Sequence, residues 1–176
     1  MTKNMLDRKN FLKSTVTGLA GISFLGSTVA PGIKNSEGDE DGAKFIYRTL
    51  GNTGIKVPIV SMGVMNAHNP ALVKAALDAG ITHLDTAHGY QRGRNEEMIG
   101  KVVKDFTRDS FTIGTKIPGR MQDSDKETIK EFRRRFDLSL KRLQMDYVDI
   151  LYLHGVDTPE EATRPVFMEV MSALKD

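Results

Sequence analysis

The segment Ile81–Gln91, with the sequence ITHLDTAHGYQ, decides how the rest of the chain is interpreted. Ile81 and Leu84 are typical of a buried strand, yet the run ends in Asp85, and Tyr90 follows five residues later. Burying a carboxylate at the end of a strand is costly unless another group pairs with it. The sequence therefore predicts a partner for Asp85 elsewhere in the chain.

The flanking sequence repeats one theme, a short apolar run followed by an amphipathic segment. The apolar runs, each interpreted as a strand, occupy residues 59–64, 81–87, 110–117 and 146–154. The segments after them place apolar residues at helical spacing and occupy 69–80, 94–106, 124–144 and 158–174. Two more apolar runs, at 45–50 and 55–60, flank the turn signal GNTG and predict a hairpin. The pattern is a hairpin followed by four strand–helix units.

Polar side chains mark the expected helix boundaries. Asn69 before Pro70 predicts an N-cap followed by the first helical residue. Two further patterns predict capping boxes, Ser124 with Glu127 and Thr158 with Glu161. The inward face of the first helix is expected to carry Leu72, Val73, Ala76 and Leu77.

Alternating strands and helices imply a parallel sheet with right-handed crossovers, as in an open doubly wound sheet or a (β/α)8 TIM barrel. The segment 63–70, GVMNAHNP, lacks the pattern G-x-G-x-x-G, which argues against the open dinucleotide-binding sheet. A barrel takes about 250 residues, whereas this chain has 176. We therefore expect an α/β fold with the first four β/α units of a TIM barrel, preceded by a β-hairpin.

With the strands placed in this way, four polar side chains lie at or just after the carboxyl ends of strands. Asp85, Lys116 and His154 end the second, third and fourth strands, and Tyr90 lies in the loop after the second. The carboxyl ends of barrel strands share one face, and that face carries catalysis. Lys116 would then be the partner of Asp85. A phenol has a reference pKa of about 10, and a nearby ammonium favours its ionised form. The four groups together predict an acid that protonates an oxygen on which negative charge develops.

These residues also carry a family resemblance. GITHLDTAHGYQRGRNEEMIG at 80–100, IGTKI at 113–117 and SLKRLQMDYVDILYLHG at 139–155 resemble the signatures of the aldo-keto reductases, from about Phe45 to the end of the chain. The resemblance implies an NAD(P)H-dependent oxidoreductase that reduces a small aldehyde or ketone. It implies Tyr90 as the general acid, Asp85 and Lys116 as the groups that tune it, and His154 as the group that orients the carbonyl.

The resemblance further implies NADPH, or less often NADH, as the cofactor. Within this chain Val64, Met65 and Asp85 are the expected contacts with its nicotinamide end. Phosphate-binding loops of barrels follow strands seven and eight. We therefore expect an incomplete fragment that lacks most of the cofactor site and is not a competent reductase by itself.

Two other classes of protein stay open. A metal-dependent barrel hydrolase or lyase would use Asp85, His88 and His154, although an ammonium from Lys116 opposes a divalent cation there, and no metal site is predicted. A non-catalytic half-barrel or binding module is the second alternative. Of the remaining histidines, His83 is expected to face a helix layer, and His88 is a candidate for contact with substrate.

Composition and the first residues set the wider context. The chain has no cysteine, which excludes disulfides and zinc–thiolate sites within it, and its net charge of +2 predicts no nucleic-acid partner. Residues 1–30 have a basic start, an apolar middle and small residues near Ala30, which is typical of an export signal.

The export signal resembles the twin-arginine type at DRKNFLK, residues 7–13, with Lys9 in place of the second arginine; a Sec signal or an uncleaved anchor stays open. Its charge-free part is short for a membrane span, so none is expected after cleavage. We expect export to the periplasm, or a cytoplasmic protein if the signal is not used. Residues 31–44 are a predicted flexible linker, and 45–176 the barrel half.

Overall fold

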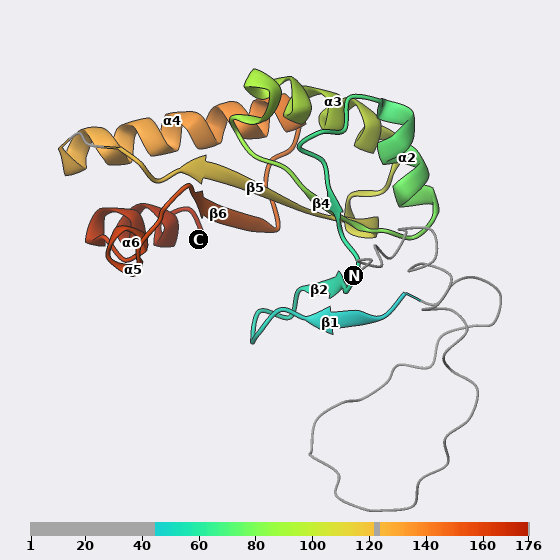
Figure 1. The fold of residues 1–176 in the computed structure, drawn as a ribbon, viewed down its shortest axis with the longest axis horizontal. Helices are drawn as coiled ribbons and strands as arrows, with labels where there is room; N and C mark the ends of the chain where they lie inside the picture. The colour runs from blue at the N-terminus through green and yellow to red at the C-terminus, as the bar shows by residue number, and fades with distance from the viewer. Residues whose placement is uncertain (1–44, 122–123, 176) are drawn as a thin grey trace, which may run out of the picture. The chain divides into compact units, whose positions relative to one another are not determined.

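The computed structural model describes residues 45–121 and 124–175 (Figure 1). The predicted export signal and linker therefore lie outside the described residues. The described part opens with an antiparallel pair, β1 (Tyr47–Thr49) and β2 (Lys56–Pro58), with Arg48 opposite Val57. This confirms the predicted hairpin.

A parallel sheet follows, and its four strands lie side by side in chain order. The strands are β3 (Met62–Gly63), β4 (His83–Asp85), β5 (Thr112–Pro118) and β6 (Ile150–His154). The register pairs Asp85 with Gly114 and Lys116 with Tyr152. Sequential order without a switch point is the arrangement of a barrel wall, whereas a doubly wound sheet reverses its strand order. The fold is thus the α/β barrel type that the sequence predicts, in its first four units.

Helices connect the strands. They are α2 (Pro70–Asp78), α3 (Arg94–Val102), α4 (Asp125–Leu143), α5 (Pro159–Ala162) and α6 (Pro165–Ser172), with single 3-10 turns at Tyr90–Gly93, Val103–Asp105 and Arg108–Ser110. Asn69 caps α2 as predicted, because its Oδ1 accepts a hydrogen bond of 3.0 Å from the N–H of Ala71.

The structure corrects three details of the helix predictions. Leu72 is 54% exposed and does not belong to the buried stripe of α2, which is formed by Val73 and Leu77. Ser124 precedes α4 but makes no side-chain cap hydrogen bond, so the predicted capping box is not formed there. Thr158 does cap α5 by accepting from the N–H of Glu161, whose own carboxylate accepts from Asp157 N rather than from the cap residue.

The two faces of the sheet differ because side chains alternate along each strand. One face carries Leu84, Ile113, Ile117, Leu151 and Leu153, which pack with apolar residues of α2, α3, α4 and α6 into two core clusters. In Figure 1 the helices α2, α3 and α4 lie along the same side of the sheet. The register places His83, Asp85, Gly114, Lys116, Tyr152 and His154 on the opposite face. In a closed barrel this second face is the interior.

The helices α3 and α4 approach each other closely at Gly100. A Cβ added at Gly100 would lie 2.6 Å from the main-chain oxygens of Arg142 and Leu143 at the end of α4. Glycine is thus required for the packing distance between α3 and α4, and this distance brings Arg142 next to the loop that carries Tyr90.

Candidate active site

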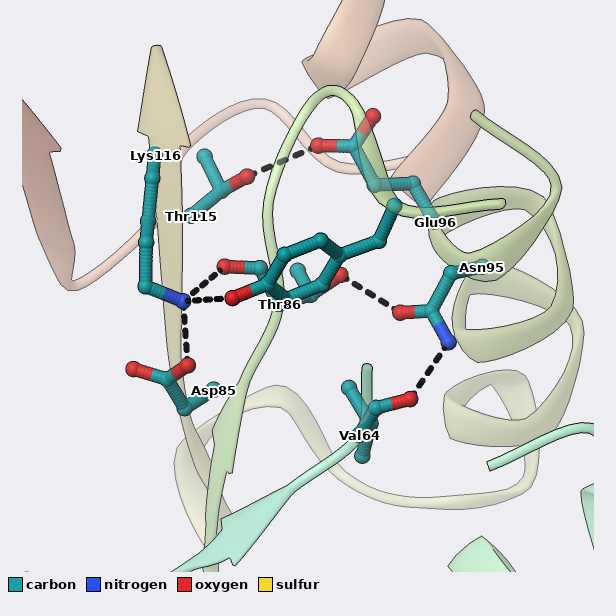
Figure 2. Close-up of polar contacts among 8 residues, drawn as sticks. Val64, Asp85, Thr86, Asn95, Glu96, Thr115 and Lys116 are labelled. Carbon is teal, nitrogen blue, oxygen red and sulfur yellow. Dashed lines mark hydrogen bonds and ion pairs between the residues drawn. The ribbon is translucent and has the colours of Figure 1, made fainter. Parts of the chain in front are cut away.

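The centre of the interior face is an ion pair between Lys116 and Asp85. The two side chains come from neighbouring strands, and the Lys116 ammonium contacts the Asp85 carboxylate directly. It also donates to the main-chain oxygen of Thr86 at 2.6 Å (Figure 2). The side chain of Lys116 is 15% exposed and that of Asp85 is 32% exposed. The pairing answers the question raised by a carboxylate at the end of a buried strand.

Tyr90 and His154 complete the group. The Lys116 Nζ lies 3.3 Å from the Tyr90 hydroxyl and 4.8 Å from the centroid of its ring. The Tyr90 ring meets His154 edge to face, with ring centroids 5.9 Å apart and an interplanar angle of 85°. All four predicted residues therefore come together at the carboxyl end of the sheet. Lys116 differs from its predicted place only in that β5 continues for two residues beyond it, to Pro118.

Two buried polar residues at the start of α3 hold the strand ends, and sequence reasoning assigned them no role. Asn95 accepts from Thr86 Oγ1 at 2.6 Å and donates to the oxygen of Val64 at 2.7 Å, which joins the loops after β4 and β3 (Figure 2). Glu96 accepts from Thr115 Oγ1 at 2.7 Å. Both Asn95 and Glu96 are fully buried. A polar pair on the inward face of a predicted helix was the available signal, because such residues are buried only when paired.

Tyr152 is a second phenol on the same face that the sequence analysis passed over. Its ring centroid lies 5.9 Å from Lys116 Nζ. Burial raises the pKa of Tyr152, and the negative charge of Asp85 raises it further. Period-two alternation was the signal: Tyr152 and His154 are two residues apart in one strand and so share a face.

The family model described as "Aldo/keto reductase family" matches residues 60–176. The chain belongs to the aldo/keto reductase family. Among curated members, L-glyceraldehyde 3-phosphate reductase of Escherichia coli is 36% identical in an alignment 149 positions long that covers 73% of this chain and 42% of that protein. L-galactose dehydrogenase of Arabidopsis thaliana is 35% identical in an alignment 126 positions long that covers 65% of this chain and 39% of that protein.

A solved aldo-keto reductase from Klebsiella pneumoniae in complex with NADPH superposes with a TM-score of 0.52 at 26% identity, over 68% of this chain and 43% of that one. The chain thus spans about two-fifths of the length of the curated family members it matches.

Within this aldo/keto reductase chain, the three residues expected near a nicotinamide differ in exposure. Met65 is 49% exposed, and its main-chain oxygen accepts from Gln91 Nε2 at 3.0 Å. Asp85 faces the barrel interior. Val64 is fully buried in the apolar core, and its N–H donates to the oxygen of Asp85 at 3.0 Å. Met65 and Asp85 are the two that present exposed side-chain surface.

Two other histidines of this family member, His83 and His88, have structural partners. The prediction that His83 faces the helix layer is wrong. His83 alternates with Leu84 along β4 and so lies on the interior face of the barrel wall, where its Nδ1 lies 2.8 Å from Thr112 Oγ1. His88 Nδ1 lies 3.0 Å from Ser139 Oγ on α4. Among the described residues, no three His, Asp or Glu side chains gather as metal ligands, so the metal-dependent alternative gains no support there.

Folding stability is expected to fall as the pH drops below the ordinary histidine pKa of 6.5. Burial lowers the pKa of His83 from 6.5, with the charge of Lys116 acting in the same direction against Asp85 and Asp149. Below pH 6.5 the unfolded chain therefore binds more protons at His83 than the folded chain does. The contribution of neutral His83 to the free energy of unfolding is fully present above pH 6.5 and is lost as the pH falls towards the folded-state pKa. Urea unfolding at pH 7.5 and 5.5 should show this, with a smaller difference for His83→Gln than for the wild type. The exposed His68→Gln is the control, and equal pH dependence in all three proteins would contradict the assignment.

Proposed function

We propose that this chain supplies the proton-donating part of the active site of an NAD(P)H-dependent reductase that converts a small aldehyde or ketone to an alcohol. One observation carries the proposal: on the face opposite the helices, one ammonium contacts both a carboxylate and the Tyr90 hydroxyl. A lone catalytic tyrosine is a weak acid near neutrality. A charged lysine within hydrogen-bond distance stabilises the phenolate that remains after the proton has left.

Each residue then has a separate task. The phenol of Tyr90 donates its proton to the carbonyl oxygen as that oxygen gains negative charge. Asp85 and the oxygen of Thr86 hold the Lys116 ammonium in place beneath the hydroxyl. His154 meets the Tyr90 ring edge to face, and its imidazole N–H would donate a hydrogen bond to the same carbonyl oxygen. Donors arranged in advance in a poorly solvated site stabilise developing charge more strongly than water does.

The residues present fit the reactive end of a nicotinamide. Bound there, NADPH supplies the hydride that adds to the carbonyl carbon. The register places Asp85 and Lys116 on the sheet face opposite the two apolar core clusters, and the side chain of Met65, in the loop after β3, is 49% exposed. Asp85 and Met65 would hold the nicotinamide end. The likeness to a Klebsiella pneumoniae reductase in complex with NADPH supports this choice of cofactor.

Transfer of deuterium tests the proposal directly. Because this chain by itself is expected to lack most of the cofactor site, the assay uses a protein in which the remaining barrel units accompany it. This protein is incubated with NADPH deuterated at the transferable C4 position and with a panel of small aldehydes and ketones. We expect one deuterium on the carbinol carbon of the alcohol product, as read by mass spectrometry. A panel in which no alcohol carries deuterium, while a family member with a complete barrel labels the same substrates, would contradict the proposal.

We also propose that residues 1–30 direct export, by the twin-arginine or the Sec route, and that the protein acts in the periplasm. The support is the sequence pattern alone, since these residues lie outside the described part. Among the described residues, no helix is both long and apolar enough to span a bilayer. Recovery of the protein from the cytoplasmic fraction alone, with its amino terminus intact, would contradict export.

A further inference from the structure

A partly buried arginine contacts the loop that carries Tyr90. Arg142 is in the last turn of α4, and its side chain is 18% exposed. Its Nη1 donates to the main-chain oxygen of His88 at 3.0 Å and lies 3.3 Å from Glu96 Oε2. Glu96 is fully buried and is anchored to β5 through Thr115. The arginine therefore connects the rigid start of α3 with the main chain two residues before Tyr90.

The same main-chain position is held from the sheet. The N–H of His88 donates to the oxygen of Lys116 at 3.1 Å, while the imidazole of His88 lies against Ser139 of α4. His88 is thus fixed on one side by the strand that bears the catalytic lysine and on the other by Arg142. Its position sets how far the Tyr90 hydroxyl lies from the ammonium.

The residues after Tyr90 adopt a conformation that requires support. Gln91 has φ 51° and Arg92 has φ 59°, both in the left-handed region although neither is glycine. This region costs roughly 1–2 kcal/mol per residue, and such conformations persist where surrounding contacts hold them. Gly93 continues the turn at φ 89°, and a Cβ there would overlap the guanidinium of Arg142. The strained turn therefore packs directly on the arginine.

We propose that Arg142 is a positioning residue for the proton donor: it holds the β4–α3 loop in the conformation that keeps the Tyr90 hydroxyl at the Lys116 ammonium. The proposal rests on the proposed function, in which Tyr90 is the general acid. Arg142 touches no reacting atom and acts through the oxygen of His88 and the turn at 91–93. Because an error of about 1 Å in the placement of a catalytic group costs about 100-fold in rate, loss of this support should lower kcat more than it changes KM.

The test replaces Arg142 and at the same time neutralises Glu96, so that no unpaired carboxylate is left buried. The double variant Arg142→Met, Glu96→Gln is compared with Glu96→Gln alone, in which Arg142 keeps its bond to His88. Arg134→Met is the matched control on the same helix, since Arg134 is 60% exposed and pairs with Glu131. Amide hydrogen exchange is followed for Tyr90 and Arg92, whose N–H groups donate to Ala87 and Gly89 at 3.0 and 3.1 Å.

We expect exchange at these two amides to rise about tenfold or more in the double variant, with the amides of β5 unchanged, because local opening moves only the loop. Neither Glu96→Gln nor Arg134→Met should show this rise. Equal exchange in the double variant and in Glu96→Gln would overturn the proposal. If the double variant does not fold, Arg142→Lys decides: its shorter side chain keeps Glu96 paired, so the same two amides should still exchange faster, and unchanged exchange would overturn the proposal.

The kinetic readout separates the two claims. In the reductase assay the double variant should lose about tenfold to 100-fold in kcat with KM within about twofold. If the amides of Tyr90 and Arg92 exchange faster in the double variant while kcat is unchanged, Arg142 does not position the Tyr90 hydroxyl for catalysis. A wild-type protein with the complete barrel that reduces no carbonyl would instead refute the proposed function, and the exchange experiment would still decide whether Arg142 holds the Tyr90 loop.

Discussion

Tyr90→Phe is expected to lower kcat for carbonyl reduction by about 100- to 10,000-fold, the usual contribution of a positioned general acid. The change removes one oxygen and leaves the ring that packs edge to face on His154. The Lys116 ammonium keeps its contacts with Asp85 and Thr86. The loss should therefore fall on proton donation and leave cofactor affinity within about twofold. Steady-state kinetics and fluorescence titration with NADPH measure the two quantities separately.

Tyr152→Phe is the matched control for this variant. Tyr152 lies on the same face, but its ring centroid is 5.9 Å from Lys116 Nζ, and burial raises its pKa. Removing its hydroxyl should change kcat by less than about threefold, because a phenol that holds its proton more firmly is a poorer donor. Equal losses of kcat in the two variants would show that the reaction depends no more on the Tyr90 hydroxyl than on that of Tyr152. A Tyr90→Phe variant that keeps the wild-type kcat would refute the role of Tyr90 as the acid.

Much of the fold could be predicted because each signal was local. The cap at Asn69, the turn at GNTG and the alternation of strands with helices all depend on residues close together in the chain. The wrong predictions concern residues whose burial depends on how helices and strands pack against each other. Leu72 fits a helical stripe, yet it is 54% exposed because α2 packs through Val73 and Leu77.

The candidate site divides in the same way. Asp85, Lys116 and His154 could be placed together because parallel strands bring their carboxyl ends to one edge. Arg142, Glu96 and Asn95 could not, because their roles depend on how closely α3 approaches α4, and Gly100 sets that distance. His88 was a candidate for contact with substrate from its loop alone; the structure adds that its Nδ1 lies 3.0 Å from Ser139 Oγ on α4, a contact that the sequence does not reveal.

Glu96→Ala is expected to destabilise the protein by about 3–5 kcal/mol, the usual effect of removing one partner from a buried ion pair. Glu96 is fully buried and accepts from both Arg142 and Thr115. Its removal leaves the Arg142 charge without its carboxylate and the hydroxyl of the buried Thr115 without its acceptor, in addition to a cavity. Urea unfolding followed by circular dichroism measures the change in the free energy of unfolding.

Two variants show how much of the loss in the free energy of unfolding comes from leaving the Arg142 charge unpaired. Glu97→Ala makes the same change one residue further along the same helix, at an exposed position, and should stay within about 0.5 kcal/mol of the wild type. Glu96→Gln keeps the shape and one oxygen for Thr115, so it should cost less than Glu96→Ala. A loss below about 1 kcal/mol for Glu96→Ala would place it among ordinary surface changes. The carboxylate would then not be the group that anchors Arg142 beside the Tyr90 loop.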